Sequence, residues 1–440
     1  MVKKRLSMLQ LTAILFVVAG WAFAMLTMIN GNGKKEQRRL VEKAQLLAAD
    51  GLYMPAAEIY EQALDDYSTD ANPEIELTLL QLYKDAGKTE EYMDLVEDRI
   101  DDGTATVEEY LYLADIHLNN GSIRGAITVL KNGTEQTEDV TVRDKYESIR
   151  YEHSLREIPF RKVKNADTAL AFPVESEGKW GYADSRGRLL TAAVFDEAFA
   201  FCGDFAVVKQ QGEYRLINAA GDLYGRDKNS LNRVSDYCEE TIAGVKNGKY
   251  ALYTKMFEPV TEHIYDDIIL GYGNRHLVKE AGEWKLVDET GDGIGDNIFL
   301  DVPVNSQGKA YVAKRAMVKD AGGYYVARAN GKDNLDDGLR FANAKAIEEK
   351  GGYIAVADST GKWGFIDEEG QLMIDYKFSD AKSFSCGLAA VKTGAGWSYI
   401  NPYGNVVIRA DYDEAYPFRD GSALVCDGGI YKIITLKFYE

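Results

Sequence analysis

The pattern of hydrophobic and polar positions divides the chain into three parts. Residues 6–29 form an apolar run without a charged residue. Residues 36–158 carry apolar positions at intervals of three and four, which is typical of helices packed on one face. Residues 159–440 carry short apolar runs separated by polar turns with glycine, which is typical of β-hairpins. We therefore expect a multidomain α+β chain with an N-terminal part (1–35), a helical domain and an all-β domain.

The first apolar run predicts a transmembrane anchor. A helix over residues 6–29 would be about 36 Å long, which is enough for a hydrocarbon core of about 30 Å. A cleaved signal peptide is the alternative, because Ala22-Phe23-Ala24 resembles a cleavage site, but the apolar run continues beyond Ala24. Basic residues flank both ends and do not decide the orientation. The short N-terminal tail favours a single-pass protein with an extracytoplasmic body; a cytoplasmic-facing body and secretion after cleavage are the alternatives.

Glycines punctuate the helical domain at a regular spacing. Gly51, Gly87 and Gly121 lie 36 and 34 residues apart, each between two helical runs. A tight turn at such a place favours a residue without a Cβ. The spacing therefore predicts consecutive helix pairs, about three in number, with a capping helix over residues 139–155.

This pattern resembles the tetratricopeptide repeat, a helix pair of 34 residues. The first unit matches best, at Gly51, Tyr53, Ala56, Tyr60 and Ala63. Proteins of this kind are adaptor modules, so the resemblance implies a groove that binds a protein partner. Carried over position by position, the groove residues would be Gln81, Lys84, Asp115 and Asn119. A stalk without a binding role is the alternative.

The all-β domain repeats one hairpin motif, in which a valine and a short polar turn with glycine precede an aromatic residue. In "VKNGKY" (245–250) the turn is Asn-Gly, the strongest short-range hairpin signal. The motif occurs eight times, with the leading aromatic residues Trp180, Tyr214, Tyr250, Trp284, Tyr324, Trp363, Trp397 and Tyr431. Their intervals are 34 to 36 residues, except for intervals of 40 and 39 on either side of Tyr324. The domain is therefore an internal array with two insertions, and we expect the leading aromatic residues to be structural core positions.

Two units of the array share a longer pattern, "GKWGYADSRG" (178–187) and "GKWGFIDEEG" (361–370). This pattern resembles the WG-repeat (β-repeat) family of bacterial proteins over about residues 168–440, with seven repeats plus complementary strands at the two ends. The resemblance implies an architecture and no particular activity. Both the Trp and the Gly vary between units, so we interpret the pair as a packing signature rather than as a catalytic loop.

The two ends of the all-β domain predict that it closes on itself. Residues 168–176 look like the last strand of a unit whose beginning is missing, and residues 430–440 look like the first strands of another. Pairing them would form a β-propeller-like ring of small blades and would remove exposed strand edges. An open solenoid of stacked hairpins is the alternative.

Charge and motifs bear on the chemistry. The net charge of −19 disfavours nucleic acid as a partner. The four cysteines form no CxxC pair, which leaves idle thiols or a single disulfide. The sequence carries no P-loop, GxSxG or HExxH motif. The stretch "DETGDGIGDN" offers a candidate calcium site, whose ligands would be Asp288, Asp292 and Asp296. An extended turn between strands is the alternative.

These observations lead to a hypothesis about function. We expect a membrane-anchored, non-enzymatic interaction or scaffold protein without a cofactor, held in the membrane by residues 6–29. Its helical repeats and β-repeat domain would bind a protein partner or a surface polymer. A glycan or cell-wall binding module, with a surface polysaccharide as ligand, is the alternative. An enzyme of unknown class is the less favoured alternative.

Overall fold

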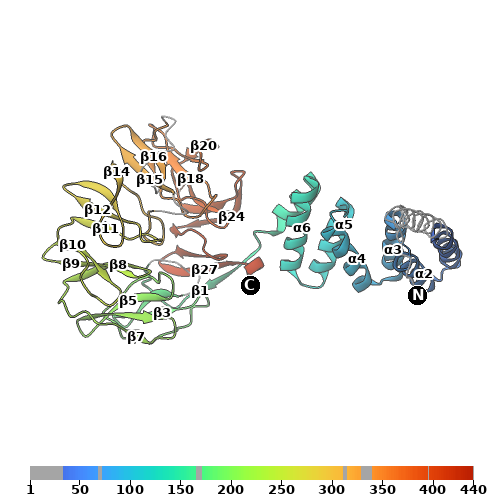
Figure 1. Ribbon diagram of the computed structural model, residues 1–440, viewed down its shortest axis with the longest axis horizontal. Coiled ribbons are helices and arrows are strands. Elements are labelled where there is room, and N and C mark those ends of the chain that lie inside the picture. The colour runs from blue at the N-terminus through green and yellow to red at the C-terminus, as the bar shows by residue number, and fades with distance from the viewer. Residues whose placement is uncertain are drawn as a thin grey trace, which may run out of the picture. The chain divides into compact units, whose positions relative to one another are not determined.

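The computed structural model describes residues 33–67, 72–164, 171–310, 315–328, 339–394 and 396–439. The chain divides into two compact units, one that ends at Ile149 and one that begins at Arg150 (Figure 1). The expected anchor, residues 6–29, lies outside the described residues. Among the helices that the structure describes, none is both long enough and apolar enough to cross a membrane.

Helices joined by short glycine turns make up the first unit. Gly51, Gly87 and Gly121 have φ angles of 77°, 67° and 76°, a left-handed conformation that other residues rarely adopt. The predicted turn glycines are therefore confirmed. Residues 33–49 are helical, and the helices that follow are α2 (Tyr53–Asp65), α3 (Asn72–Ala86), α4 (Thr89–Asp101), α5 (Val107–Asn119), α6 (Ile123–Thr137) and α7 (Val140–Ile149).

A buried cation joins three of these helices. The side chain of Arg99 on α4 is only 6% exposed, and it pairs with Glu76 on α3 at 2.7 Å and with Glu109 on α5 at 3.2 Å. Glu109 also completes a capping box with Thr106 at the start of α5. Ala56 and Tyr60 are buried, as their spacing on α2 predicts. The apolar pattern of the sequence therefore corresponds to packed helix faces, and the buried ion pairs of Arg99 connect the helices.

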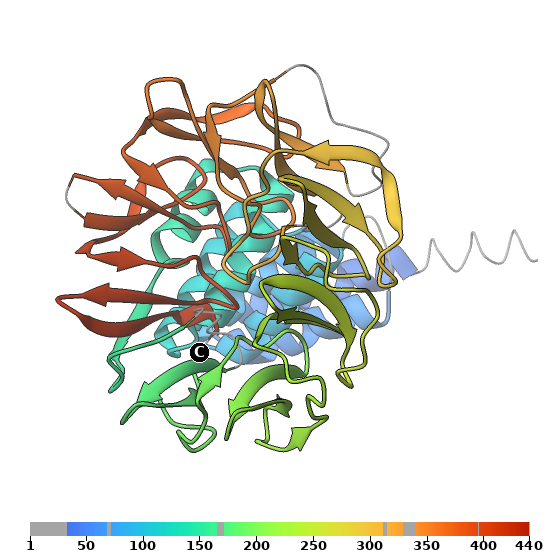
Figure 2. The same ribbon diagram turned by 90° about the vertical axis from the view of Figure 1, so that its left-hand side faces the viewer.

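Small antiparallel sheets follow one another around a ring in the second unit (Figure 2). Within its described residues, six sheets have three or four strands, and two consist of a single hairpin, β2–β3 and β15–β16. Isolated bridges extend both hairpins, such as Trp180 to Phe195 and Tyr324 to Phe341. All eight sheets therefore follow one plan. The fold is the predicted β-propeller-like ring and not the open solenoid.

All eight hairpins expected from the valine–turn–aromatic motif are formed. They are β2–β3, β5–β6, β9–β10, β12–β13, β15–β16, β18–β19, β22–β23 and β26–β27. In a complete sheet such as β21–β24, a short first strand precedes the hairpin and a longer strand follows it.

The first thirteen strands are β1 (His153–Glu157), β2 (Phe172–Ser176), β3 (Lys179–Ala183), β4 (Glu197–Ala198), β5 (Phe205–Gln210), β6 (Glu213–Asn218), β7 (Leu223–Tyr224), β8 (Arg233–Cys238), β9 (Thr241–Lys246), β10 (Lys249–Thr254), β11 (Asp267–Ile269), β12 (His276–Glu280) and β13 (Glu283–Val287). The others are β14 (Gly293–Phe299), β15 (Arg315–Asp320), β16 (Gly323–Arg328), β17 (Asn343–Ala344), β18 (Ile354–Ala357), β19 (Trp363–Ile366), β20 (Leu372–Phe378), β21 (Asp380–Ala381), β22 (Ala389–Thr393), β23 (Gly396–Ile400), β24 (Val406–Tyr412), β25 (Glu414–Ala415), β26 (Ser422–Asp427) and β27 (Ile430–Leu436). A 3₁₀ turn, η1 (Lys437–Tyr439), ends the described chain.

The ring closes through a strand that the sequence analysis had placed in the helical domain. The last helix, α7, ends at Ile149, and β1 then pairs antiparallel with β27 (Figure 1). Beyond β1, the chain runs beside β2, where the Lys164 amide donates to the Pro173 carbonyl. The expected direct pairing of residues 168–176 with 430–440 is therefore wrong, because residues 153–164 lie between the two fragments and bond to both. Closure itself is confirmed.

Candidate functional site

The leading aromatic residues of the repeats pack against cations. Tyr214, Trp284, Tyr324, Trp363 and Trp397 are buried, and Trp180, Tyr250 and Tyr431 are half-buried. In seven repeats a cation lies 4.2–5.7 Å from the ring centroid, in the pairs Lys164–Trp180, Lys209–Tyr214, Arg233–Tyr250, Lys279–Trp284, Lys319–Tyr324, Lys345–Trp363 and Lys382–Trp397. Such pairs contribute about 0.5–1 kcal/mol each. The structure therefore places these aromatic residues in packing positions.

The glycine of the Trp-Gly pair has its own structural reason. A Cβ on Gly364 would lie 2.6 Å from the carbonyl oxygen of Ile374 on the neighbouring strand β20. A Cβ on Gly181 would lie 3.0 Å from the Cα of Ala193. These neighbours are backbone atoms, which yield much less easily than a flexible side chain. Gly is required where the next strand passes this close.

The candidate calcium residues are part of a turn between strands. Oδ1 of Asp288 accepts hydrogen bonds from the amides of Thr290 at 2.9 Å and Asp292 at 3.0 Å. Asp358 holds the turn of another repeat in the same way. Asp296 is exposed on β14. In the part of the chain that the structure describes, no group of three or more His, Cys, Asp or Glu residues could hold a metal ion.

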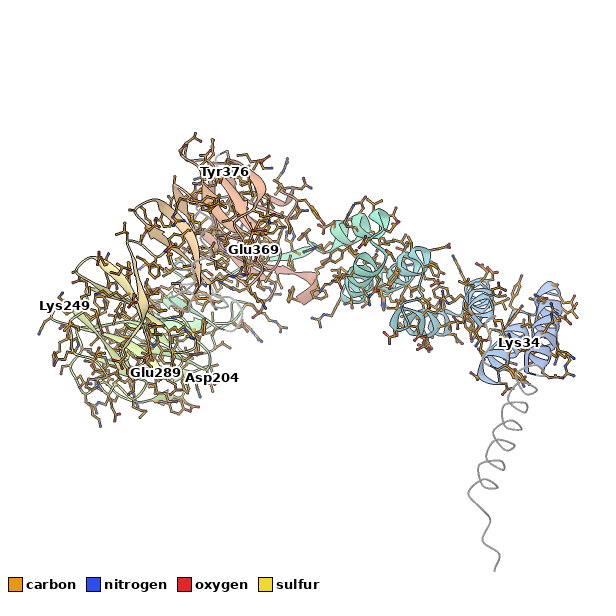
Figure 3. All side chains as sticks on the ribbon, turned by 45° about the horizontal axis from the view of Figure 1, so that its top comes forward. Lys34, Asp204, Lys249, Glu289, Glu369 and Tyr376 are labelled. Carbon is orange, nitrogen blue, oxygen red and sulfur yellow. The ribbon has the colours of Figure 1, made fainter. Side chains whose placement is uncertain are left out.

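Charged side chains also hold the hairpin ends at the outside of the ring. Lys249 lies at the edge of the β-unit in Figure 3, and its Nζ pairs with Asp266 at 2.6 Å. Lys179 pairs with Asp196 at the same distance in another repeat. Both lysines are about half exposed, so these pairs contribute little to stability. These ion pairs have a local role at the turns. The interior of the ring, where several repeats meet, is the place to look for a site.

One long connection forms hydrogen bonds with distant repeats in the interior of the ring. The interval from Trp284 to Tyr324 is 40 residues long because of an insertion between β14 and β15. We call residues 303–310 of this insertion the central connection. Ser306 accepts a hydrogen bond at 3.1 Å from Arg419, which precedes β26. Along the ring, the sheets β15–β16, β17–β20 and β21–β24 stand between these two residues. In the other direction, Nζ of Lys309 reaches the carbonyl of Tyr237 at 3.3 Å. The central connection therefore links repeats that are not neighbours.

Glu348 and Arg419 form a buried ion pair that contacts Ser306 of the central connection. Their side chains are 8% and 13% exposed. Arg419 also donates to the carbonyl of Glu348 at 2.9 Å, and the hydroxyl of Ser306 donates to the Glu348 carboxylate at 2.8 Å. Burial raises the pKa of Glu348, and the charge of Arg419 and the bonds from Ser306 oppose this shift. The Glu348 carboxylate therefore depends on Arg419 and Ser306 to stay charged.

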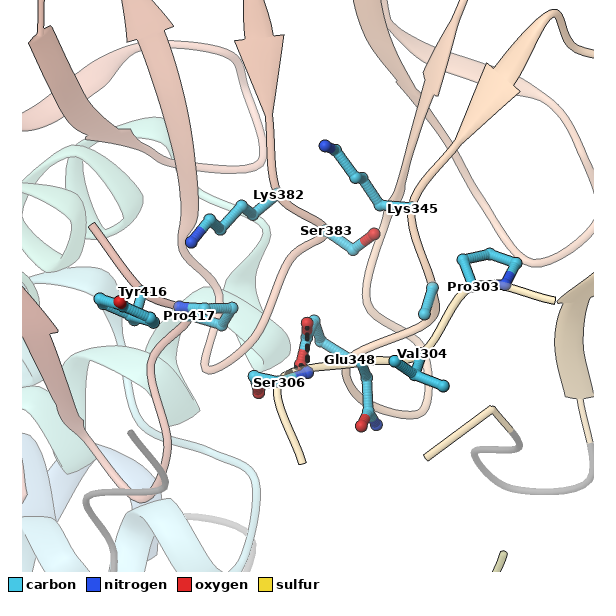
Figure 4. A pocket seen from close by; sticks show the side chains of 11 residues that line it. Pro303, Val304, Ser306, Lys345, Glu348, Lys382, Ser383, Tyr416 and Pro417 are labelled. Carbon is cyan, nitrogen blue, oxygen red and sulfur yellow. Dashed lines mark hydrogen bonds between the residues drawn. The ribbon is translucent and has the colours of Figure 1, made fainter. Parts of the chain in front are cut away.

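A cavity of about 300 Å³ opens beside this ion pair, and we call it the inner pocket (Figure 4). Four connections line it. Three of them follow the short first strands β17, β21 and β25, and the fourth is the central connection, which follows β14 and the bridge from Asp301 to Lys319 on β15. Its residues are Pro303, Val304, Asn305, Ser306, Lys345, Ala346, Glu348, Lys382, Ser383, Tyr416 and Pro417.

Two lysines and an amide supply hydrogen-bond donors to the inner pocket. Nζ of Lys345 pairs with Asp380 at 3.2 Å. Nζ of Lys382 lies 4.4 Å from the ring centroid of Tyr416 and forms no ion pair with a carboxylate of the described residues. Asn305 is 6% exposed, and within the described chain its Nδ2 has no hydrogen-bond partner.

Burial lowers the pKa of Lys382, and the nearby Glu348 carboxylate opposes this shift. A negatively charged ligand group beside Nζ would offset the same burial cost. Apolar walls with a few convergent donors are typical of a binding site, and a carboxylate matches donors of this kind. The geometry of the inner pocket therefore suits an organic group that carries a negative charge.

The helical unit has a second hollow, of about 370 Å³. Of the four expected groove residues, Gln81 and Lys84 line it, and Lys84 lies 3.4 Å from Glu108. Asp115 instead pairs with Lys145 on α7, and Asn119 is exposed at the end of α5. The structure therefore brings two of the four residues together. The other lining residues of this hollow are Leu77, Leu80, Tyr92, Thr106, Val107, Glu108 and Glu109.

The residues of the inner pocket were missed in the sequence, although a positional signal exists. Lys345, Lys382 and Tyr416 each follow the alanine that ends a short first strand. An alignment of the repeats with one another would have placed them at one position. Nothing in the sequence alone shows that this position faces the interior of a ring.

Comparison with known protein families supports the repeat architecture. The family model described as "WG containing repeat" matches residues 180–214, 363–397 and 397–431. These three stretches are WG repeats. No curated protein matches the chain. Together with the propeller-like fold, the WG repeats indicate a protein-interaction or binding module.

Several solved structures resemble the chain at low identity. A eukaryotic initiation factor has 13% identity and a TM-score of 0.40, and the match covers 64% of this chain and 84% of that one. YCF48 bound to D1 peptide has 10% identity and a TM-score of 0.34, over 66% and 98% of the two chains. Apo AztD from Citrobacter koseri has 11% identity and a TM-score of 0.35, over 63% and 89%. At these scores the likenesses carry no argument about function.

Proposed function

We propose that this protein is a membrane-anchored, non-enzymatic interaction protein whose β-ring binds a protein partner. The apolar run over residues 6–29 supports the anchor, and an extracytoplasmic body is part of the proposal. The helix pairs joined at Gly51, Gly87 and Gly121 support an assignment as tetratricopeptide-like repeats. The hollow that contains Gln81 and Lys84 is the place where a second partner segment would bind.

The observation that carries the proposal is the inner pocket. Nζ of Lys382 forms no direct ion pair there with a carboxylate of the described residues, and Nδ2 of Asn305 offers a donor that has no hydrogen-bond partner in the described chain. Pro303, Val304, Ala346 and Pro417 supply apolar surface to the same pocket. A protein segment with a carboxylate, from Asp, Glu or a chain end, supplies both the charge and the apolar contact that this pocket lacks.

Burial of the repeated aromatic residues favours a protein over a polysaccharide. Sugar binding needs aromatic faces that are open to solvent, whereas Trp284, Trp363 and Trp397 are 5–8% exposed. Their faces lie against lysine side chains rather than against solvent. The buried tryptophans therefore do not offer a surface polysaccharide the open ring faces that it would need.

Proximity labelling in the native cell tests partner and topology together. Partners labelled by the wild-type chain are expected to be lost in Lys382→Gln and kept in Lys362→Gln, because Lys362 is exposed in a hairpin turn. Lys362→Gln should keep the wild-type melting temperature, and Lys382→Gln should lower it by a few degrees at most, through the loss of its contacts with Trp397 and Tyr416. Labelling of cytoplasmic proteins alone would overturn the extracytoplasmic topology.

Competition on the captured complex tests the carboxylate. A peptide of glutamates is expected to release the partner, and a peptide of glutamines of the same length is not. Equal release by both peptides would refute recognition of a carboxylate. Retention of the isolated chain on cell-wall polysaccharide, unchanged in Lys382→Gln, would favour the glycan alternative in place of the protein partner.

A further inference from the structure

Two cysteines from adjacent sheets lie in contact inside the ring. Sγ of Cys202 and Sγ of Cys238 are 2.7 Å apart, and the residues are 4% and 1% exposed. Ordinary contacts between heavy atoms that are not bonded lie near 3.5–4.0 Å. Cys202 follows β4, and Cys238 ends β8, so the pair bridges the sheets β4–β7 and β8–β10.

The surroundings of the pair favour a thiolate. Lys309 of the central connection is 1% exposed, and its Nζ donates to the carbonyl of Tyr237, next to Cys238 in the sequence. The hydrogen bond with Cys238, and after it the charge of Lys309, lower the pKa of the Cys202 thiol to about 7 against the effect of burial.

The other two cysteines behave differently. Burial raises the pKa of Cys386 and of Cys426, and the structure shows no contact between their sulfurs. Cys426 is buried and Cys386 is half-buried, and the causes that shift their pKa values include neither a partner sulfur nor a lysine charge. Since the four cysteines share one chain, Cys386 and Cys426 serve as internal controls for any reaction of the pair.

We propose that Cys202 and Cys238 form a disulfide that joins the two sheets covalently. A small-molecule disulfide such as oxidised glutathione is the oxidant. The Cys202 thiolate attacks one sulfur of it and releases one thiolate, and the Cys238 thiolate then attacks Cys202 and releases the second. Two thiols are oxidised, one S–S bond is formed in the chain, and one S–S bond is reduced in the oxidant. Because both sulfurs are buried, the exchange occurs while the chain folds or opens locally.

The disulfide would tie the ring at the point where the central connection reaches it. Lys309 contacts Tyr237 next to the pair, and Ser306 of the same connection contacts Arg419 on the far side. The bond would also fit the proposed extracytoplasmic body, because disulfides persist in oxidising compartments. The disulfide does not depend on the function of the inner pocket, since its formation can be measured without a ligand.

Mass spectrometry of the full chain in detergent tests the proposal. The protein is treated with oxidised and reduced glutathione, once as the folded protein and once during refolding from urea, and free thiols are then alkylated in urea, where burial no longer protects them. We expect two of the four cysteines to resist alkylation until a reductant is added. A peptide that joins Cys202 to Cys238 should appear, with Cys386 and Cys426 fully alkylated.

Two variants sharpen the result. Cys386→Ser/Cys426→Ser should form the same cross-link to the same extent, and Cys238→Ser should give no intramolecular cross-link and leave Cys202 as a free thiol or a glutathione adduct. Full alkylation of both Cys202 and Cys238 after both treatments would overturn the proposal. A cross-link of either residue to Cys386 or Cys426 would also overturn it.

Discussion

Replacing Arg419 with methionine is expected to weaken the whole ring. The change removes the cation that pairs with the buried Glu348 carboxylate, and with it the hydrogen bonds to the Glu348 carbonyl and to Ser306. Loss of one partner from a buried ion pair leaves an unpaired buried charge, which costs about 3–5 kcal/mol. Urea unfolding of the full chain at pH 8 measures this loss. The control Arg188→Met removes an exposed pair with Asp184, which contributes at most about 1 kcal/mol.

The pH dependence of the Arg419→Met variant identifies the cause. Burial raises the pKa of Glu348, and removal of Arg419 removes the main effect that opposes this shift. The folded variant then binds a proton more readily than the unfolded chain, so its stability is greatest at low pH and falls as the pH rises through the folded pKa. The deficit against the wild type should therefore shrink as the pH is lowered from 8 to 5.

A second substitution provides the refuting result. In Glu348→Gln/Arg419→Met the buried charge is gone, so the double variant should be more stable than Arg419→Met alone at pH 8. The two effects are coupled because the side chains touch. A single variant within about 1 kcal/mol of the wild type, or a double variant no more stable than the single one, would refute an interaction of this size.

Three further predictions concern the ring. Burial lowers the pKa of His276 from 6.5 to about 4. Since the unfolded chain therefore takes up the proton first, His276 should lower the wild-type stability by about 3 kcal/mol as the pH falls from 6.5 to 4. Urea unfolding of His276→Gln across this pH range should show a flatter profile. Gly364→Ala places a Cβ against the carbonyl of Ile374 and should cost about 1–3 kcal/mol, whereas Gly361→Asn in the open hairpin turn should cost less. A chain shortened to begin at residue 159 lacks β1, exposes the edge of β27, and should aggregate in size-exclusion chromatography where a chain beginning at residue 150 stays monomeric.

Local signals explain what the sequence predicted correctly. A hairpin is defined by residues within about ten positions of one another, and Asn247 and Gly248 adopt the positive φ angles, 52° and 80°, that a two-residue turn requires. The turn glycines of the helical unit are local in the same sense. For this reason the hairpins and the period of the array could be recognised without a structure.

Long-range pairings explain what the sequence missed. Strand β1 is short, and its residues are half-buried or exposed, so it lacks the alternating pattern of an independent strand. It becomes a strand because β27, more than 270 residues later, offers it an unpaired edge. Asn305 and Lys382 likewise meet in one pocket only because the ring brings their repeats together. No local pattern carries such information.

The central connection changes how the repeats depend on one another. In an open array each repeat contacts only its neighbours, and stability is a sum of local terms that allows repeat-by-repeat unfolding. Here β1 closes the ring, and Ser306 links to Arg419 across three intervening sheets. Opening any one repeat therefore strains contacts in repeats that are not beside it. We expect the β-unit to unfold in one cooperative step, and Arg419→Met should lower the midpoint without changing the slope of the urea transition. A biphasic transition of a chain that begins at residue 150, and so lacks the helical unit, would show that the repeats still unfold in sequence and that the cross-ring contacts are too weak to couple them.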